Sequence, residues 1–432
     1  MTADNHTSSY SVCVIGGGLV GKMAALELAA NGSSLTLGAP QKIALIAAKP
    51  KTPDKRTTAM LMPAIEMLRE LNLWEDIRPL TAALKTMRLI DGSKRLLRAP
   101  MTDFQSTEID LEAFGYNVPN ADMLAALEAA IAKSPLIDCY SNMAEVSSIT
   151  EDVATVTLDD GRVLKSHLLV AADGQFSATR QAAGISVKRW TYPQTAIVLN
   201  FAHSLPHGSV SAEFHTETGP FTQVPLPPNS TSPHRSSLVW LINPTDVDAL
   251  LTLPIADLSA LIEDKLQSSY GKCQVEGPPA AIPMAGMTAE RFGANRTVLI
   301  GESGHLFPPI GAQGFNLGMR DLRDLVAVLS LSSGDPGRAE NTSRYDQKRQ
   351  LDVKSRTAGI DAMNRSLLTD FLPVQFLRTA GLATLGSVTT ARKIAMLQGV
   401  GMESQIPTLF SAPGKDLLAK FRWQSDRAAP SR

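Results

Sequence analysis

The sequence predicts an α/β protein, and three features of the 432-residue chain support that prediction. A buried-strand pattern over residues 12–15 runs into a glycine-rich turn and then a helical pattern, which is the order of a Rossmann-like domain. Residues 191–239 show alternating and β-rich runs broken by Gly, Pro and Ser, which predict a mostly antiparallel sheet. From residue 341 onward the pattern is helical. We therefore expect a Rossmann-like domain, an inserted antiparallel-sheet domain and a helical C-terminal region.

Composition limits what the protein can be. The chain is too long for one compact core, and its 44% apolar and 19% charged residues are typical of a globular protein. A net charge of −1 gives no basic footprint, so we expect no nucleic-acid partner. The three cysteines lie far apart, which favours a reducing compartment. The first apolar stretch carries Lys22 and Glu27 and has no basic leader, so we expect neither a signal peptide nor a membrane span, and a cytoplasmic location.

The first motif is "SVCVIGGGLVGKMAALELAANG", a strand, a turn and a helix that runs to Asn31. Gly16, Gly18 and Gly21 have the GxGxxG spacing of a dinucleotide-binding turn. In such a turn the first glycine permits the bend, the second lets the backbone approach a pyrophosphate, and the third lets helix and strand pack closely. The phosphate then lies at the helix N-terminus, which favours an anion. The alternative is a glycine-rich turn that binds nothing.

One part of this fingerprint is absent. The second strand of a dinucleotide-binding unit usually ends in Asp or Glu, which holds the ribose hydroxyls. Here that strand reads "KIALIAAKP", with Ala47 or Ala48 at the position of the acid. The ribose is therefore held in another way, or its site is partly open.

Two further segments carry candidate residues. In "PDKRTTAML", Arg56 is a candidate pyrophosphate ligand because a guanidinium matches phosphate oxygens, although a lone arginine is more often solvated. In "LLVAADGQFSATRQAAGI", an apolar strand stops at Asp173–Gly174, and Ser177 and Arg180 lead into a helix. Asp-Gly after a strand is also an ordinary turn.

The last motif is "GESGHLFPPIGAQGFNLGMRD", residues 301–321. A strand pattern over 297–300 enters it, and a helical pattern over 317–329 leaves it. Glycines and prolines dominate the segment between them, so it presents mostly bare backbone at a helix N-terminus. His305 is a candidate base there, but a structural role is the stronger expectation.

Taken in order, the segments read GxGxxG, DxRxxA, ADGxxSxxR and GE(x2)H(x3)P(x)GAQGxNxGxxD. This arrangement resembles the class A FAD-dependent aromatic monooxygenases, which have the para-hydroxybenzoate hydroxylase fold, and among them the ubiquinone-biosynthesis hydroxylases. The resemblance covers almost the whole chain and includes "FGYNVPNADMLAAL", "GPFTQVPL" and "YDQKRQLDV".

The resemblance implies FAD as cofactor and a set of residues that hold it. It places Glu302 at the ribityl chain, and Pro309 with the loop 311–314 against the flavin ring, where free N–H groups of the following helix stabilise negative charge. The implied FAD-binding residues are Gly16, Gly18, Gly21, Arg56, Asp173, Gly174, Glu302, Pro309, Gly311, Gln313, Gly314 and Asn316. The chain departs from the family pattern where Glu302 replaces Asp, Ser303–Gly304 replace Ala-Ala, and Gly311–Ala312 reverse a commoner order.

The resemblance also implies a reaction. Through a flavin C4a-hydroperoxide, molecular oxygen would hydroxylate the aromatic ring of a polyprenylated phenol, with NAD(P)H or another donor bound transiently because no second GxGxxG is present. A substrate so apolar implies peripheral contact with the inner face of a membrane, or a ubiquinone-biosynthesis protein complex. Residues 371–382 are the candidates for such contact, although core packing is the stronger expectation for this apolar stretch. A halogenase, an FAD-dependent reductase of prenyl chains and a non-catalytic flavin-holding subunit remain alternatives.

These motifs also predict a division of the chain. The FAD-binding domain is discontinuous, at 8–80, 105–188 and 285–340. The substrate domain comprises 81–104 and 189–284, and the C-terminal helical region 341–432. The histidines lack metal-ligand spacing, since Pro206 makes a helix through His203 and His207 improbable, so we expect no metal site.

Overall fold

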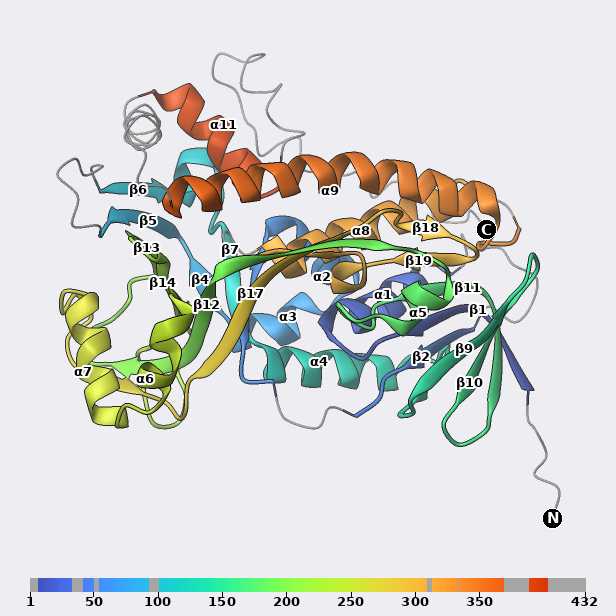
Figure 1. Cartoon of the computed structure of the whole chain (residues 1–432), viewed down its shortest axis with the longest axis horizontal. Helices are drawn as coiled ribbons and strands as arrows, with labels where there is room; N and C mark the ends of the chain where they lie inside the picture. The colour runs from blue at the N-terminus through green and yellow to red at the C-terminus, as the bar shows by residue number, and fades with distance from the viewer. Residues whose placement is uncertain are drawn as a thin grey trace, which may run out of the picture.

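The computed structural model in Figure 1 shows two large β-sheets joined by long strands, with helices packed on both. It describes residues 7–32, 42–49, 54–92, 101–308, 313–332, 334–368 and 388–402.

The first sheet has eight strands, and its centre is parallel in the order β19-β11-β1-β2-β8. Two of its strands, β9 and β10, form an antiparallel extension from β11. The apolar run Val12–Ile15 pairs with Leu168–Ala171 on one side and with Ile43–Ile46 on the other, so the central strand has no free edge there. The strands are β1 (Thr7–Ile15), β2 (Ile43–Ile46), β8 (Ile137–Tyr140), β9 (Ala144–Ile149), β10 (Ala154–Leu158), β11 (Val163–Ala171), β18 (Gly293–Ala294) and β19 (Thr297–Leu299).

The two faces of this sheet are buried differently. Val12 and Val14 pack into a core with helices, whereas Cys13 and Ile15 pack under the β9–β10 hairpin. Such alternation follows from the two-residue period of a strand. The helices and short helical turns on this side of the molecule are α1 (Leu19–Ala30), α2 (Met62–Glu70), α3 (Trp74–Ile77), η1 (Arg78–Leu80), α4 (Asn120–Ala132), α5 (Ala178–Ala182), η4 (Gly301–Ser303), α8 (Gln313–Ser330) and α9 (Ala339–Leu368). The turn η2 (Ser106–Ile109) lies apart from them, because Ile109 packs with Phe104 and Met396.

The second sheet has nine strands, most of them antiparallel. Two long strands, β12 and β17, run from beside the first sheet into the second and connect the two halves of the molecule (Figure 1). The strands are β5 (Thr86–Asp91), β6 (Thr102–Gln105), β12 (Val187–His203), β13 (Val210–Thr216), β14 (Gly219–Leu226), β15 (Arg235–Ile242), β16 (Cys273–Val275), β17 (Ala280–Ala289) and β20 (His305–Leu306).

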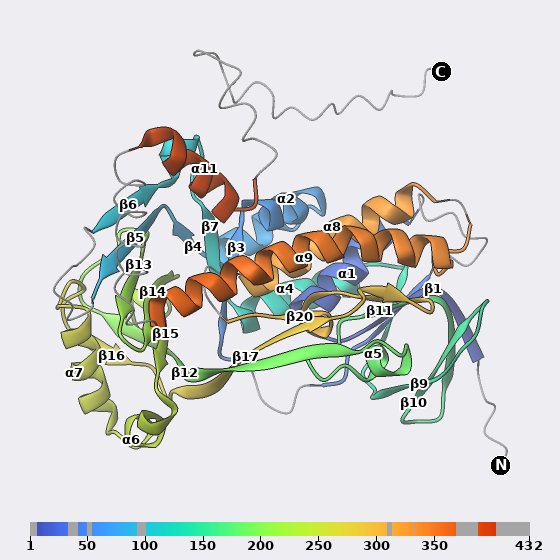
Figure 2. The same cartoon turned by 45° about the horizontal axis from the view of Figure 1, so that its top comes forward.

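Helices cover one face of the second sheet and its far edge. Strand residues such as Phe221 and Trp240 share a core with Leu258 and Ile262 of α7, so α6 and α7 lie on that face. At the other end α11 packs beside β6, where Met396 and Leu397 contact Phe104 (Figure 2). These elements are η3 (Pro244–Asp246), α6 (Val247–Leu251), α7 (Ile255–Lys265) and α11 (Thr389–Gly399).

A small third sheet links the two large ones. Its order is β3-β7-β4, with β3 at Thr57–Leu61, β4 at Ala82–Leu84 and β7 at Gly115–Pro119. The buried carboxamide of Asn117 in β7 donates to the carbonyl of Pro225 in β14 at 2.8 Å, which ties this sheet to the nine-stranded one.

The structure confirms the expected fold class: a parallel Rossmann-like sheet, an inserted sheet that is mostly antiparallel, and C-terminal helices. The domain ranges stay a prediction, because residues 81–104 supply strands to two sheets and β17 crosses residue 285. Among the described helices, none has the length and apolarity to cross a bilayer. The apolar stretch 371–382 lies outside the described residues.

Candidate functional site

The glycine turn gives each of its three motif glycines a different environment. Gly16 has a φ of +133°, and a Cβ there would lie 2.1 Å from the carbonyl oxygen of Ala172. A Cβ on Gly21 would lie 2.0 Å from the carbonyl oxygen of Gly16. A Cβ on Gly18 would meet no described atom within 4 Å. The first and third glycines are therefore needed by the protein's own packing, whereas Gly18 borders open space at the N-terminus of α1.

The Asp173–Gly174 segment lies directly against this turn, because the N–H of Ala172 donates to the carbonyl of Ile15 at 2.8 Å. One carboxylate oxygen of Asp173 accepts from the N–H and the hydroxyl of Thr179, at 3.1 and 2.9 Å. Its other oxygen, Oδ1, is buried and has no hydrogen-bond partner among the described residues. A buried acceptor without a partner is costly, so Asp173 is suited to accept a hydrogen bond from a ligand.

The last motif joins the same place through a buried carboxylate. Asp321 of α8 is fully buried, and its Oδ2 accepts from the N–H of Gly301 at 2.8 Å and from Nε2 of His305 at 2.7 Å. Its Oδ1 lies 2.7 Å from Nε of Arg349, which α9 supplies. His305 is thus held in the interior by Asp321, as its expected structural role requires.

Charge balances this buried carboxylate. Burial by itself would raise the pKa of Asp321, but the charges of His305 and Arg349 and the hydrogen bond from Gly301 outweigh it and lower that pKa. Arg349 is 1% exposed and also lies 2.7 Å from Asp324 and 2.9 Å from Asp352. Asp321 therefore stays ionised and fixes the start of the 301–305 loop.

Local packing explains two departures from the family pattern. The Ser303 hydroxyl donates to the carbonyl of Ala171 at 2.6 Å, which ties the loop to β11. A Cβ at Gly304 would lie 3.0 Å from the Phe292 ring, so that position favours glycine here. The carbonyl of Ser303 also accepts from Nη1 of the buried Arg180 at 2.7 Å, which links the segment that follows Asp173–Gly174 to the last motif.

Arg56 is held by a neighbouring carboxylate and also senses the charge of Glu302. The hydrogen bonds to Asp54, at 2.8 and 2.9 Å, are the largest cause of a raised pKa of Arg56, and the charge of Glu302 adds to it. Asp54 is held in turn by the Asn120 carboxamide at 2.8 Å. Arg56 is therefore oriented by its ion pair with Asp54, while Glu302 is exposed.

The start of α8 is anchored to the small sheet. The Asn316 carboxamide accepts from the N–H of Leu61 at 2.8 Å and donates to the carbonyl of Ala59 at 2.8 Å. Its side chain thus positions α8 against β3. Gln313 begins α8, and a Cβ on Gly314 would meet no described atom within 4 Å. Pro309 and Gly311 lie outside the described residues.

The structure thus brings the four motif segments together around backbone that faces open space at Gly18, Gly174 and Gly314. These spaces and the unpartnered Asp173 oxygen fit a dinucleotide with a flat ring. At the end of β2, a Cβ on Gly17 would lie 2.7 Å from that of Ala47, so the small residue at the usual acid position fits the turn tightly.

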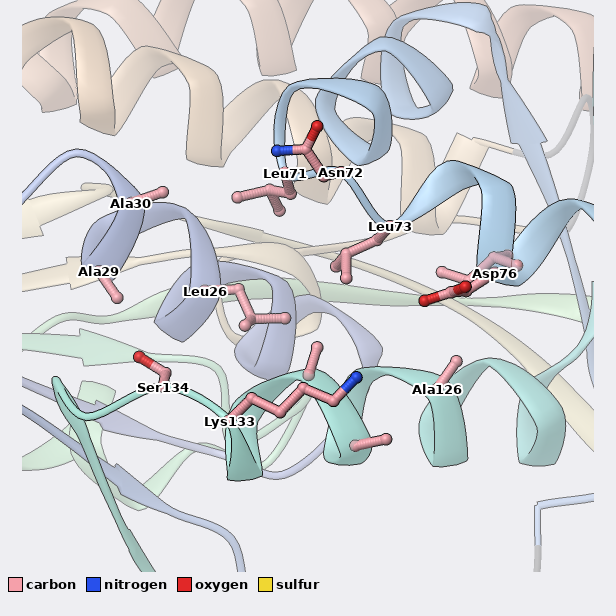
Figure 3. A pocket seen from close by; sticks show the side chains of 13 residues that line it. Leu26, Ala29, Ala30, Leu71, Asn72, Leu73, Asp76, Ala126, Lys133 and Ser134 are labelled. Carbon is pink, nitrogen blue, oxygen red and sulfur yellow. The ribbon is translucent and has the colours of Figure 1, made fainter.

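A groove lies elsewhere in the described part of the chain. It has a volume of about 460 Å³ and lies between the C-terminal part of α1, the α2–α3 connection and α4 (Figure 3). Leu26, Leu73 and Ala126 line it together with Asp76 and Lys133, and none of the residues implied to bind FAD lines it. Within the described ranges there is also no group of three or more His, Cys, Asp or Glu placed to hold a metal ion.

Sequence reasoning missed one pair of titratable residues, Glu213 and His215 on β13. Nε2 of His215 lies 2.9 Å from Oε1 of Glu213. Residues two apart on a strand lie on the same face of the sheet, so this spacing could have indicated that the two side chains are neighbours. The spacing alone did not identify the pair as functional, because the sequence does not indicate which face of the sheet is turned toward the cofactor.

Comparisons with known proteins agree with this geometry. Residues 9–358 match the family model described as "FAD binding domain". Ubiquinone hydroxylase UbiL of Rhodospirillum rubrum is 29% identical over 90% of this chain and 89% of its own. The 3-demethoxyubiquinol 3-hydroxylase of Escherichia coli is 26% identical over 90% of this chain and 98% of its own.

A solved structure shows the same fold. The p-nitrophenol 4-monooxygenase PnpA from Pseudomonas putida aligns with a TM-score of 0.71 at 16% identity, over 92% of this chain and 99% of that one. The expected resemblance to FAD-dependent aromatic monooxygenases, and to ubiquinone-biosynthesis hydroxylases among them, is therefore confirmed.

Proposed function

The chain belongs to the FAD-binding domain family, and from that premise we propose that it hydroxylates the aromatic ring of a polyprenylated phenol in ubiquinone biosynthesis. The names of relatives that align over about 90% of the chain support this substrate class. Molecular oxygen is the co-substrate, and NAD(P)H or another donor that binds transiently supplies the electrons.

The observation that carries the proposal is the convergence of four distant segments on one cofactor site. The residues proposed to hold FAD leave space at the backbone of Gly18, Gly174 and Gly314, and Asp173 offers an unpartnered acceptor. When bound there, FAD supplies the oxygen-activating chemistry.

The chain's own residues hold and orient that cofactor. The N-terminus of α1 beside Gly16, Gly18 and Gly21 would receive the pyrophosphate, with Arg56 nearby. Asp173 and Glu302 would accept hydrogen bonds from the cofactor's hydroxyl groups. Asn316 is proposed as part of the FAD site, where its contacts with β3 would position the N-terminus of α8. The loop at Pro309, Gly311 and Gln313 would supply bare backbone beside that ring.

The apolar prenyl chain of the proposed substrate determines where the enzyme can bind it. Each CH₂ group left in water costs about 0.8 kcal/mol, so a polyprenylated phenol stays in a bilayer or on a carrier protein. We propose a cytoplasmic protein that contacts the inner face of the membrane peripherally through residues 371–382, or joins a ubiquinone-biosynthesis complex. We also retain the proposed division into a discontinuous FAD domain, a substrate domain and a C-terminal helical region.

Deleting the gene and profiling quinone intermediates tests the proposal. The expected result is accumulation of a prenylated phenol that lacks one hydroxyl group, reversed by the wild-type gene. Accumulation of an intermediate with an unsaturated prenyl chain would instead favour the prenyl reductase. An unchanged quinone profile would refute both. If the purified protein then shows no phenol-stimulated oxidation of reductant although the deletion blocks a hydroxylation, the flavin-holding subunit is favoured.

A further inference from the structure

Glu213 and His215 form a half-buried acid–base pair on β13, with 18% and 14% of their side chains exposed. Nε2 of His215 lies 2.9 Å from Oε1 of Glu213, and the hydroxyl of Thr222 donates to Oε2 of Glu213 at 3.3 Å. Nδ1 of His215 has no hydrogen-bond partner among the described residues. The carboxylate therefore fixes the proton on Nε2, which leaves Nδ1 as an acceptor.

The strand register determines which face carries this pair. Glu213 is paired with Thr222, and Thr222 with Val239, so their side chains point to the same face of the sheet. Thr222, Val239 and Glu213 are all half-buried, whereas the alternate residues Phe214, Phe221 and Trp240 are buried under α7. The pair thus lies on the face that α6 and α7 do not cover.

That face is the one turned toward the cofactor site. Ser237 lies two residues before Val239 on β15 and therefore shares its face. Its hydroxyl accepts from the hydroxyl of Thr57 at 3.1 Å, and Thr57 follows Arg56 directly in the chain. Glu213 is two strands away from Val239, which is about 10 Å at the usual strand spacing. With the two-residue offset between Val239 and Ser237, about 7 Å along the strand, the pair lies roughly 12 Å from the Ser237–Thr57 contact and on the same face of the sheet.

Other charged groups facing the pair can be identified. Asp91 of β5 is paired with His215 in the parallel register, so its carboxylate lies on the same face. Leu89, which is paired with Glu213, packs against the α11 cluster of Phe104 and Met396. Apolar side chains thus border the pair on one side, and the carboxylate of Asp91 lies on the other.

We propose that His215, oriented by Glu213, accepts the proton of the substrate's phenol hydroxyl. In this step the O–H bond breaks and an Nδ1–H bond forms, so the products are a phenolate and an imidazolium that Glu213 stabilises. No electrons are transferred. A phenolate is more electron-rich than a phenol, and its ring therefore takes up an electrophilic oxygen atom more readily. This inference rests on the proposed function, and positioned bases of this kind contribute roughly 10²–10⁴-fold to rate.

The test measures phenolate formation on binding rather than turnover. The probe is a prenylated nitrophenol, added to the oxidised FAD-loaded enzyme at a pH below the probe's own pKa, so that phenolate absorbance reports deprotonation by the protein. The wild type should bind the probe as phenolate. His215→Gln should retain FAD and bind the probe with at least about tenfold less phenolate, and Glu213→Gln should lower it to an intermediate extent. His167→Gln, which removes a histidine from β11 of the other sheet, is the matched control.

The outcomes separate this inference from the proposed function. Phenolate in the wild type and in His215→Gln alike would overturn the role of His215 and leave the hydroxylase proposal standing. Binding of the probe by the wild type as the neutral phenol would also overturn the role of His215. If the wild type binds no prenylated phenol at all, the hydroxylase proposal fails and this inference fails with it.

Discussion

At the scale of single residues, the three motif glycines serve different needs although they share one motif. Gly16 and Gly21 are required by the protein's own backbone, because a Cβ at either would lie about 2 Å from a carbonyl oxygen. Gly18 has a φ of −74°, which any residue adopts, and a Cβ there would meet nothing within 4 Å. Neither packing nor backbone conformation requires glycine at position 18, so a bound ligand is the remaining reason for glycine there.

Replacing Gly18 with Val should abolish FAD binding and leave the fold intact. The branched side chain would fill the space through which the backbone approaches the pyrophosphate, and hydrogen bonds to charged groups are each worth roughly 1.5–3 kcal/mol. Flavin absorbance of the purified protein and its far-UV circular dichroism measure the two effects. Gly21→Val is the control and should fail to fold. A folded Gly18→Val protein with undiminished FAD affinity would mean that the turn binds no phosphate.

Glu27 in α1 gives a pH dependence of stability. Burial, with the charge of Glu70, raises its pKa from 4.5 to about 7. The folded state therefore keeps the Glu27 proton between those values while the unfolded state loses it. Stability from this group is greatest below pH 4.5, falls as pH rises toward 7 and is constant above 7.

Glu27→Gln should consequently stabilise the protein only at higher pH. At about pH 8 we expect the variant's free energy of unfolding to exceed that of the wild type by up to about 3.4 kcal/mol, since the shift from 4.5 to about 7 is 2.5 pKa units at 1.36 kcal/mol each. At about pH 4.5 the two should agree, because Glu27 is protonated in the folded wild type. Urea unfolding at both pH values checks this. An equal gain at both would attribute the effect to packing instead.

At the scale of elements, α9 fixes the loop that enters α8. Arg349 reaches from α9 to Asp321, whose other oxygen holds Gly301 and His305. All of these groups are buried, so breaking the cluster leaves charge in the interior without a partner.

Arg349→Met should therefore destabilise the protein by about 3–5 kcal/mol and weaken FAD retention. The control is Arg344→Met on the same helix, since Arg344 forms a surface pair with Glu340 at 2.6 Å and its loss should change little. Chemical denaturation and flavin content measure both variants. Equal stabilities for the two would show that the buried cluster contributes no more than a surface pair.

The sequence predicted those elements whose signal is local. The strand before Gly16, the glycine turn and the helix after residue 313 all follow from short patterns. Contacts between distant segments did not follow, such as Asp321 with Arg349 or Asn316 with β3. The Glu213–His215 pair was not predicted either, because the sequence does not show which face of the strand is turned toward the other sheet.

At the scale of the whole molecule, the paired strands β12 and β17 connect the second sheet to the Rossmann-like half of the molecule (Figure 1). The proposed bilayer contact is in residues 371–382, outside the described residues.

If that stretch contacts the membrane, changing Phe371, Leu372 and Phe376 to Ser should weaken liposome binding while FAD content stays normal. Sedimentation with liposomes measures this. Loss of flavin with precipitation would instead assign these residues to the core, and unchanged binding would remove them as a membrane contact.

The central claim is that the protein inserts an oxygen atom from O₂ into a prenylated phenol, and isotope labelling tests it most directly. The FAD-loaded enzyme is incubated with a reductant, a prenylated phenol and isotopically heavy O₂, and the product is analysed by mass spectrometry. We expect a ring-hydroxylated product that carries one heavy oxygen atom, and no such product from Gly18→Val. A product that has gained only hydrogen, or whose new oxygen comes from water, would contradict the account.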